Sequence, residues 1–178
     1  MVDLDIDYLS KVIDNEDMLS KLLMFFPGYR GYKRRELLRE TDRLVRETLY
    51  TEIRGFISNL REMLREIVEG EGRGDIVERL IMKAERIAER IRHAECGYAP
   101  LFATIRVNEE SLRSLIRFDA KLADKVAKLT ELSREARNRQ SVHEKLALVV
   151  KMERLVEELD NVFSKRKERM LMLAEGEE

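Results

Sequence analysis

The feature that most constrains this chain is an uninterrupted stretch of thirty-seven residues, Lys33 to Glu69, with no proline and a single glycine, Gly55. Its apolar residues recur at alternating steps of four and three, and they are Leu49, Ile53, Phe56, Leu60, Met63 and Ile67. This spacing places them on one face of an α-helix. At a rise of about 1.5 Å per residue, the helix would be roughly 55 Å long. Because so long an apolar face needs long partners to cover it, the pattern predicts a helical bundle.

A shorter helix is expected to follow a flexible turn over residues 70–74. Asp75 and Glu78 have the spacing of a capping box, with Asp in place of Ser or Thr, and predict the start of this helix. Gly97 is expected to end it. Its buried stripe should consist of Val77, Leu80, Ile81, Ala84, Ile87, Ala88 and Ile91.

Two more long helices are predicted in the second half of the chain. Asn108 is a favourable N-cap for the first of them. Apolar residues at heptad spacing, as in coiled coils, follow it at Leu112, Leu115, Leu122, Val126 and Leu129. Ser141 and Glu144 form another capping box, which predicts a tight turn over residues 137–140 and a last helix from Val142. The alternative is one continuous helix, since neither glycine nor proline interrupts this region.

The N-terminal segment, residues 1–26, is acidic and apolar on one helical face, which includes Leu9, Leu19, Leu23 and Phe26. We expect a helix there that ends before Pro27, because proline cannot donate the next amide. The run Leu22 to Phe26 should pack over the bundle, or alternatively present an apolar patch to a partner. The predicted fold is therefore a single domain over residues 1–178: an all-α, antiparallel four-helix bundle with long helices and an additional N-terminal helix.

Composition restricts the functional classes. The chain carries 34 basic and 35 acidic residues, so no overall field would draw it onto nucleic acid or an anionic membrane. Its longest apolar run has five residues, whereas a membrane-spanning helix needs about 20. One cysteine, Cys96, and an acidic N-terminus predict a cytoplasmic protein. The abundance of charged residues, with one glutamine, is typical of thermophiles.

Basic and tyrosine residues should gather at one end of the bundle. Folding back at residues 70–74 brings the connector after Gly97 toward the start of the long helix. The candidate anion or nucleic-acid site is Tyr29, Arg30, Tyr32, Lys33, Arg34, Arg35 and Tyr98. Bases in the first turn of a helix oppose its dipole, and such local violations often mark functional sites. Alternatively, the interleaved acids Glu36 and Glu40 neutralise this end.

Two aspartates occupy positions of the apolar stripes. Asp42 lies one heptad before Leu49, and Asp119 falls between Leu112 and Val126 in heptad phase. A buried carboxylate must be paired, neutral or bound to a metal. Arg46, on the same side of the long helix as Asp42, is the predicted partner. A salt bridge is the favoured interpretation; a ligand site and solvent exposure are the alternatives.

The residues offer little for catalysis or for metal binding. Glu89, His93 and Cys96 share a helical face opposite Ile87 and Ile91, so solvent is their expected neighbour. Neither histidine has a glutamate three residues before it, as the inward Glu-x-x-His pairs of di-iron bundles require. We expect no cofactor and no metal, and an enzyme is the least supported class because no nucleophile and base can be paired.

Two stretches carry a resemblance. They are residues 27–33, Pro-Gly-Tyr-Arg-Gly-Tyr-Lys, and residues 97–102, Gly-Tyr-Ala-Pro-Leu-Phe. Together with flanking residues over roughly 27–127, the chain resembles an uncharacterised family of bacterial and archaeal helical proteins. The resemblance implies a helical fold and no activity. The favoured function is a non-enzymatic interaction or scaffold protein that self-associates or binds a protein partner. The alternative is nucleic-acid or phosphate-ligand binding at the basic end.

Overall fold

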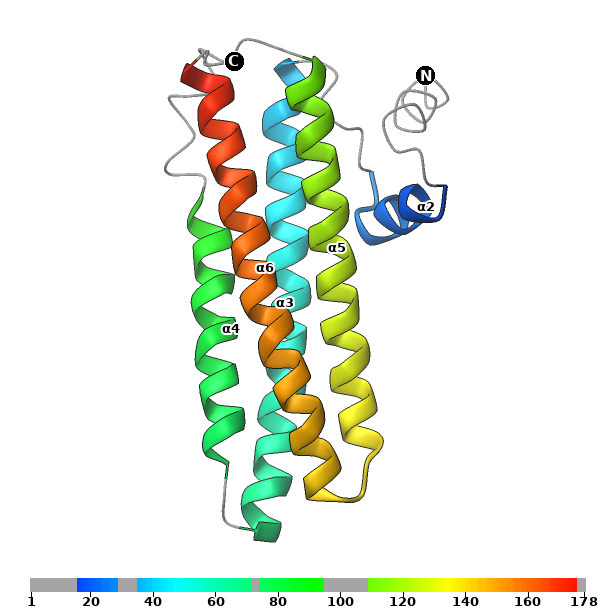
Figure 1. Cartoon of the computed structure of the whole chain (residues 1–178), viewed down its shortest axis with the longest axis vertical. Coiled ribbons are helices and arrows are strands. Elements are labelled where there is room, and N and C mark those ends of the chain that lie inside the picture. The colour runs from blue at the N-terminus through cyan, green and yellow to red at the C-terminus, as the bar shows by residue number, and fades with distance from the viewer. Residues whose placement is uncertain (1–15, 29–34, 72–73, 95–108, 176–178) are drawn as a thin grey trace.

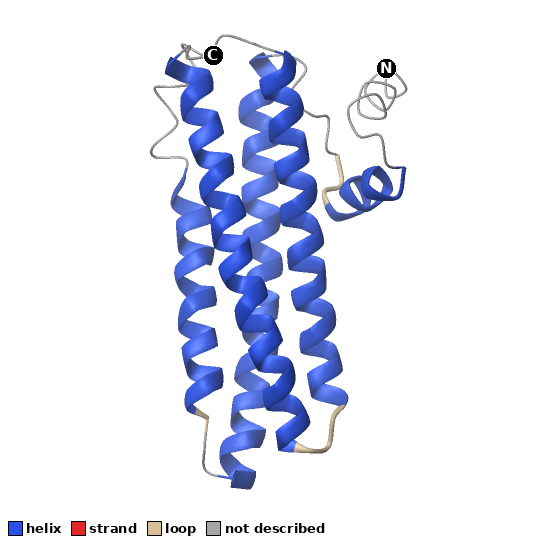
Figure 2. Cartoon of the chain, in the orientation of Figure 1, coloured by secondary structure: helices blue, strands red, loops and turns tan. Residues whose placement is uncertain are grey.

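The computed structural model describes residues 16–28, 35–71, 74–94 and 109–175, and its regular elements are helices (Figure 2). In chain order these are α2 (Glu16–Phe25), α3 (Arg35–Glu71), α4 (Asp75–His93), α5 (Glu109–Asn138) and α6 (Val142–Glu175). Helices α3 to α6 form a long bundle, and α2 lies across the outside of α5 (Figure 1). The predicted all-α, antiparallel four-helix bundle with an additional N-terminal helix is confirmed. In the described part of the chain, no helix is both long enough and apolar enough to cross a membrane.

Two helical hairpins build the bundle. The short connections at residues 72–74 and 139–141 make α3 antiparallel to α4, and α5 antiparallel to α6 (Figure 1). Across the hairpins, α3 contacts α5 and α4 contacts α6. These cross-contacts are parallel: Asn59 donates a hydrogen bond to Ser133, and one turn later in both helices Glu62 pairs with Arg137. Each helix therefore has one antiparallel and one parallel neighbour.

Helix α4 is much shorter than its neighbours, with 19 residues against 37 in α3. Its last turn lies beside the middle of α3's first half, where Arg46 Nη1 donates to the carbonyl oxygen of Arg92 at 3.4 Å. About three turns of α3 lie beyond this level, on the side of Arg35. At that end, the described residues of the bundle come from three helices, α3, α5 and α6.

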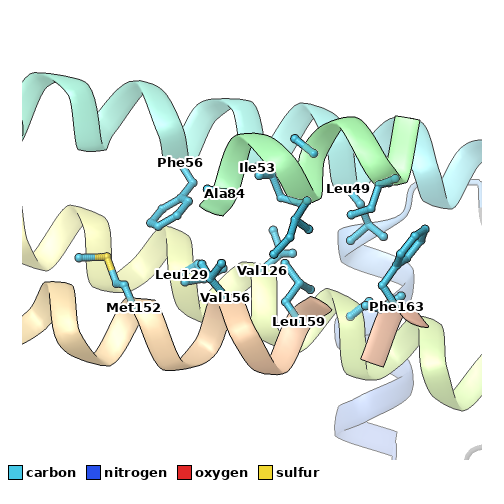
Figure 3. Packing of buried hydrophobic residues seen from close by; sticks show 14 of the residues in the cluster. Leu49, Ile53, Phe56, Ala84, Val126, Leu129, Met152, Val156, Leu159 and Phe163 are labelled. Atoms are coloured by element: carbon cyan, nitrogen blue, oxygen red, sulfur yellow. The ribbon is translucent and has the colours of Figure 1, made fainter. Parts of the chain in front are cut away.

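The apolar stripes predicted from the sequence form the core (Figure 3). All six residues that define the long stripe of α3, from Leu49 to Ile67, are at most 1% exposed. All seven predicted stripe residues of α4 are buried as well. They meet Leu122, Val126 and Leu129 from α5, and Met152, Val156, Leu159 and Phe163 from α6. Truncating one such residue to alanine typically costs about 2–5 kcal/mol.

The connection between α3 and α4 corrects two predictions. Gly70 and Glu71 belong to α3, so the turn is shorter than residues 70–74. The N-cap of α4 is Gly74, whose carbonyl accepts the first amides of the helix, and Asp75 makes no side-chain cap. Gly74 is buried, and a Cβ there would lie 2.3 Å from a methyl carbon of Leu64. The close approach of α3 therefore places the cap one residue earlier than the capping-box pattern predicts.

The structure also decides between the alternatives for the region before Val142 and for the run Leu22 to Phe26. Helix α5 ends at Asn138 and α6 begins at Val142, which confirms a break before Val142 and excludes one continuous helix. The turn covers residues 139–141, whereas the prediction placed it over 137–140. Leu22 in α2 and Phe26 directly after this helix are fully buried, so the run Leu22 to Phe26 packs on the bundle as predicted. Met24 is the exception, because 80% of its surface is exposed. Leu9 and the rest of residues 1–15 lie outside the described residues.

Candidate functional site

Most of the predicted anion site lies outside the described residues. This holds for Tyr29, Arg30, Tyr32, Lys33, Arg34 and Tyr98, whereas Arg35 is described only as the first residue of α3. The three polar residues predicted to face the core are described. Asp42 and Asp119 are fully buried, and Arg46 is 4% exposed. They belong to one buried network with a fourth residue that the sequence prediction did not include.

That fourth residue is Arg166 of α6, which is also fully buried. Its Nη1 donates to Asp42 Oδ1 at 2.8 Å, and its Nε donates to Asp119 Oδ1 at 2.7 Å. On the other side of Asp42, Arg46 Nε donates to Oδ2 at 2.8 Å. Since Arg46 also reaches the Arg92 carbonyl, the network runs from the end of α4 through α3 and α6 to α5. It therefore connects all four helices of the bundle at the level where α4 ends.

The sequence contains a signal for Arg166. Leu159, Phe163 and Met170 lie on the buried stripe of α6, and Arg166 falls between the last two at steps of three and four. A charged residue at a position of an apolar stripe breaks the hydrophobic pattern, and the same kind of break identified Asp42 and Asp119. Applying the rule to bases as well as acids would have found all four members of the network.

Among the described residues, the network has two carboxylates and two guanidinium groups, whose formal charges cancel. Guanidinium-carboxylate hydrogen bonds are charge-assisted, and they satisfy groups that would otherwise be buried at a cost of several kcal/mol. The carboxylate oxygens of Asp42 are both engaged by arginines and have no contact with solvent. Such a network specifies which helix faces pack together. It leaves Asp42 poorly placed to act as a general base or to bind a ligand.

His93 and Glu89 lie on the surface of α4, as predicted. The His93 Nε2 atom is 3.3 Å from Glu89 Oε2, and both side chains are largely exposed. Cys96, the third member of the group, lies outside the described residues. Among the residues that the structure describes, no cluster of three or more His, Cys, Asp or Glu side chains could hold a metal ion.

A groove of about 460 Å³ lies between α2 and α5. Met24 and Phe25 form its α2 side, and the small residues Ala123 and Ala127 lie on its α5 side. Thr130 also lines it, and the Thr130 hydroxyl oxygen is buried without a hydrogen-bond partner among the described residues. Charged residues of both signs, including Lys21, Lys128 and Glu131, surround the apolar part. The groove is thus an apolar strip with a mixed polar rim, as many protein-binding surfaces have.

Comparison with known proteins returns no match: no family model, no curated protein and no solved structure is significantly similar to this chain. The resemblance of residues 27–127 to a family of bacterial and archaeal helical proteins therefore stays a prediction. Any functional assignment must rest on the residues and geometry of this chain.

Proposed function

We propose that this protein is a non-enzymatic helical interaction or scaffold protein that acts in the cytoplasm through self-association or a protein partner. The observation that carries the proposal is the groove between α2 and α5, with Met24 80% exposed beside it. A large, flexible apolar side chain at such a site is typical of adaptable protein-binding surfaces. The buried ionisable groups also support a non-enzymatic function, because the arginines and aspartates of the network form hydrogen bonds with one another.

Self-association can be measured by light scattering on the purified full chain at low micromolar concentration. The proposal predicts a stable oligomer, or a partner that co-purifies from the native cells. Met24→Glu should abolish either association, because it places a charge on the apolar edge of the groove. Val150→Glu is the matched control, since Val150 is 40% exposed on α6 and does not line the groove. A monomer without partner, or equal loss with both variants, would contradict the proposal.

A second candidate function, nucleic-acid or phosphate-ligand binding, is favoured by the charge distribution at one end of the bundle. Residues 113–121 of α5 and 163–172 of α6 lie at the same end as the start of α3, because Arg166 reaches both Asp42 and Asp119. Extended to the ends of the two helices at Glu109 and Glu175, and outside the buried network, these segments carry six basic residues and four acidic ones, Glu109, Glu110, Glu168 and Glu175. The chain as a whole has a net charge of −1, so this end is locally basic.

The second candidate predicts binding to single-stranded RNA or DNA that weakens steeply as salt is raised. Neutralising Arg30, Lys33, Arg34 and Arg35 together should weaken it further. Fluorescence anisotropy with a labelled oligonucleotide measures both effects. An absence of binding at low salt would rule this function out.

A further inference from the structure

Several ion pairs join neighbouring helices on the bundle surface. Lys83 of α4 contacts both Glu153 and Glu157 of α6 at 2.7 Å. Between α5 and α6, Lys125 pairs with Glu158, and the hydrogen bond from Lys125 lowers the pKa of the Glu158 carboxyl group. Cations at these positions are therefore neutralised from within the molecule.

This pairing stops one turn beyond Lys125 on the seam between α5 and α6. Lys121 lies four residues before Lys125, and Lys165 lies seven residues after Glu158, so both project along the same seam. Both are exposed, and neither forms an ion pair among the described residues. The seam thus changes from opposite charges to like charges as it approaches the basic end of the bundle.

A further exposed cation extends the same surface. Arg117 lies one turn before Lys121 on α5 and is exposed. The helix dipole favours cations near the end of α6, but it offers no such stabilisation in the first half of α5. We define the basic seam as Arg117, Lys121 and Lys165. Its uncompensated charges are complementary to an anionic partner.

An aromatic ring lies within the basic seam. Phe118 is partly exposed, and Lys121 Nζ is 5.9 Å from the centre of its ring. Surfaces that bind single-stranded nucleic acid combine cations along the backbone path with aromatic rings on which bases stack. Residues one turn apart, such as Arg117 and Lys121, are separated by about 6 Å along the helix. Aromatic rings also occur at protein interfaces and membrane surfaces, so the test below includes an acidic polymer and anionic vesicles as competing partners.

We propose that the basic seam binds the backbone of single-stranded nucleic acid, with phosphates at Lys121 and Lys165 and a base stacked on Phe118. The inference rests on the second candidate function above and gives it a new location, since the predicted site comprised the two tyrosine-containing connectors. In this arrangement the strand runs along the seam between α5 and α6, at the end of the bundle where α3 begins.

The test measures the affinity of the full chain for a fluorescent twelve-nucleotide RNA at several salt concentrations. Replacing Lys121 and Lys165 by Gln should weaken binding about tenfold and reduce the slope of log affinity against log salt by about 1.4, or about 0.7 for each lost contact. Phe118→Leu should weaken binding about tenfold without changing that slope. The matched control replaces Arg79 and Arg86, exposed cations of α4, by Gln. This pair removes the same charge and should leave affinity within about twofold, because neither residue belongs to the seam.

The remaining outcomes distinguish a failure of the basic seam from a failure of nucleic-acid binding, the function on which the seam rests. If RNA binds, but affinity falls only when Arg30, Lys33, Arg34 and Arg35 are neutralised, the seam is wrong and the second candidate function stands. If no variant binds at low salt, both are wrong. If anionic vesicles or polyglutamate bind as tightly as RNA and Phe118→Leu has no effect, the partner is not a nucleic acid. Circular dichroism of the variants ensures that each comparison is made between folded proteins.

Discussion

Replacing Arg166 by methionine should destabilise the bundle about as much as truncating a residue of its apolar core. The substitution keeps an unbranched side chain of similar length but removes the hydrogen bonds to Asp42 and Asp119. Asp42 keeps its bond from Arg46, whereas Asp119 loses a fully buried guanidinium partner. Removing one member of a buried ion pair typically costs about 3–5 kcal/mol, because the remaining charge stays buried. At about 2–4 °C per kcal/mol for a chain of this size, the melting temperature should fall by roughly 6–20 °C.

Urea and thermal unfolding followed by circular dichroism would measure this loss. Arg154→Met is the matched control, since it makes the same replacement at an exposed position of the same helix, and it should change stability by no more than about 0.5 kcal/mol. A double-mutant cycle with Asp119→Asn should then show coupling of about 0.5–3 kcal/mol between the two sites. If Arg166→Met costs no more than Arg154→Met, the network does not hold these helices together.

Three other changes test separate parts of the structure. Gly55→Ala should raise stability by about 0.5–1 kcal/mol in urea unfolding, because a Cβ there meets nothing within 4 Å; Gly74→Ala should give no gain, since its Cβ would clash with α3. The lowered pKa of Glu158 means that its bridge to Lys125 stabilises the protein above the carboxyl's unfolded-state pKa and is lost as pH falls through the folded-state value. Lys125→Met should therefore raise the Glu158 pKa toward its ordinary value in an NMR titration, and an unchanged value would contradict the bridge. Phe26→Ala should release α2, so hydrogen exchange should accelerate in α2 while the four-helix bundle stays protected; equal acceleration throughout would show that α2 is integral to the bundle.

The buried faces of the helices could be predicted in detail because they are local properties. The stripe of α4 follows from a 3.6-residue period, and all its predicted members are buried. The turn before Val142 follows from the residue types at Ser141 and Glu144, which favour a helix start. The anomalous positions of Asp42 and Asp119 likewise follow from heptad phase alone.

The cap of α4 shows where local reasoning ends. Asp75 and Glu78 have suitable spacing for a capping box, yet Gly74 takes the N-cap position. The residue at that point lies against Leu64 of α3, and only a glycine leaves room for it. A contact between two helices, invisible in a window of a few residues, thus decided the boundary.

The sequence by itself determined the helical segments, the faces they bury and the presence of charged residues on two of those faces. The tertiary structure decided that α3 lies parallel to α5 and α4 parallel to α6, and that Arg166 is the residue that joins Asp42 to Asp119. The physical reason is that an apolar stripe shows which side of a helix must be covered, but any complementary stripe could cover it. Which helix does so depends on contacts between residues as far apart in sequence as Asp42 and Arg166, and these exist only once the bundle has formed.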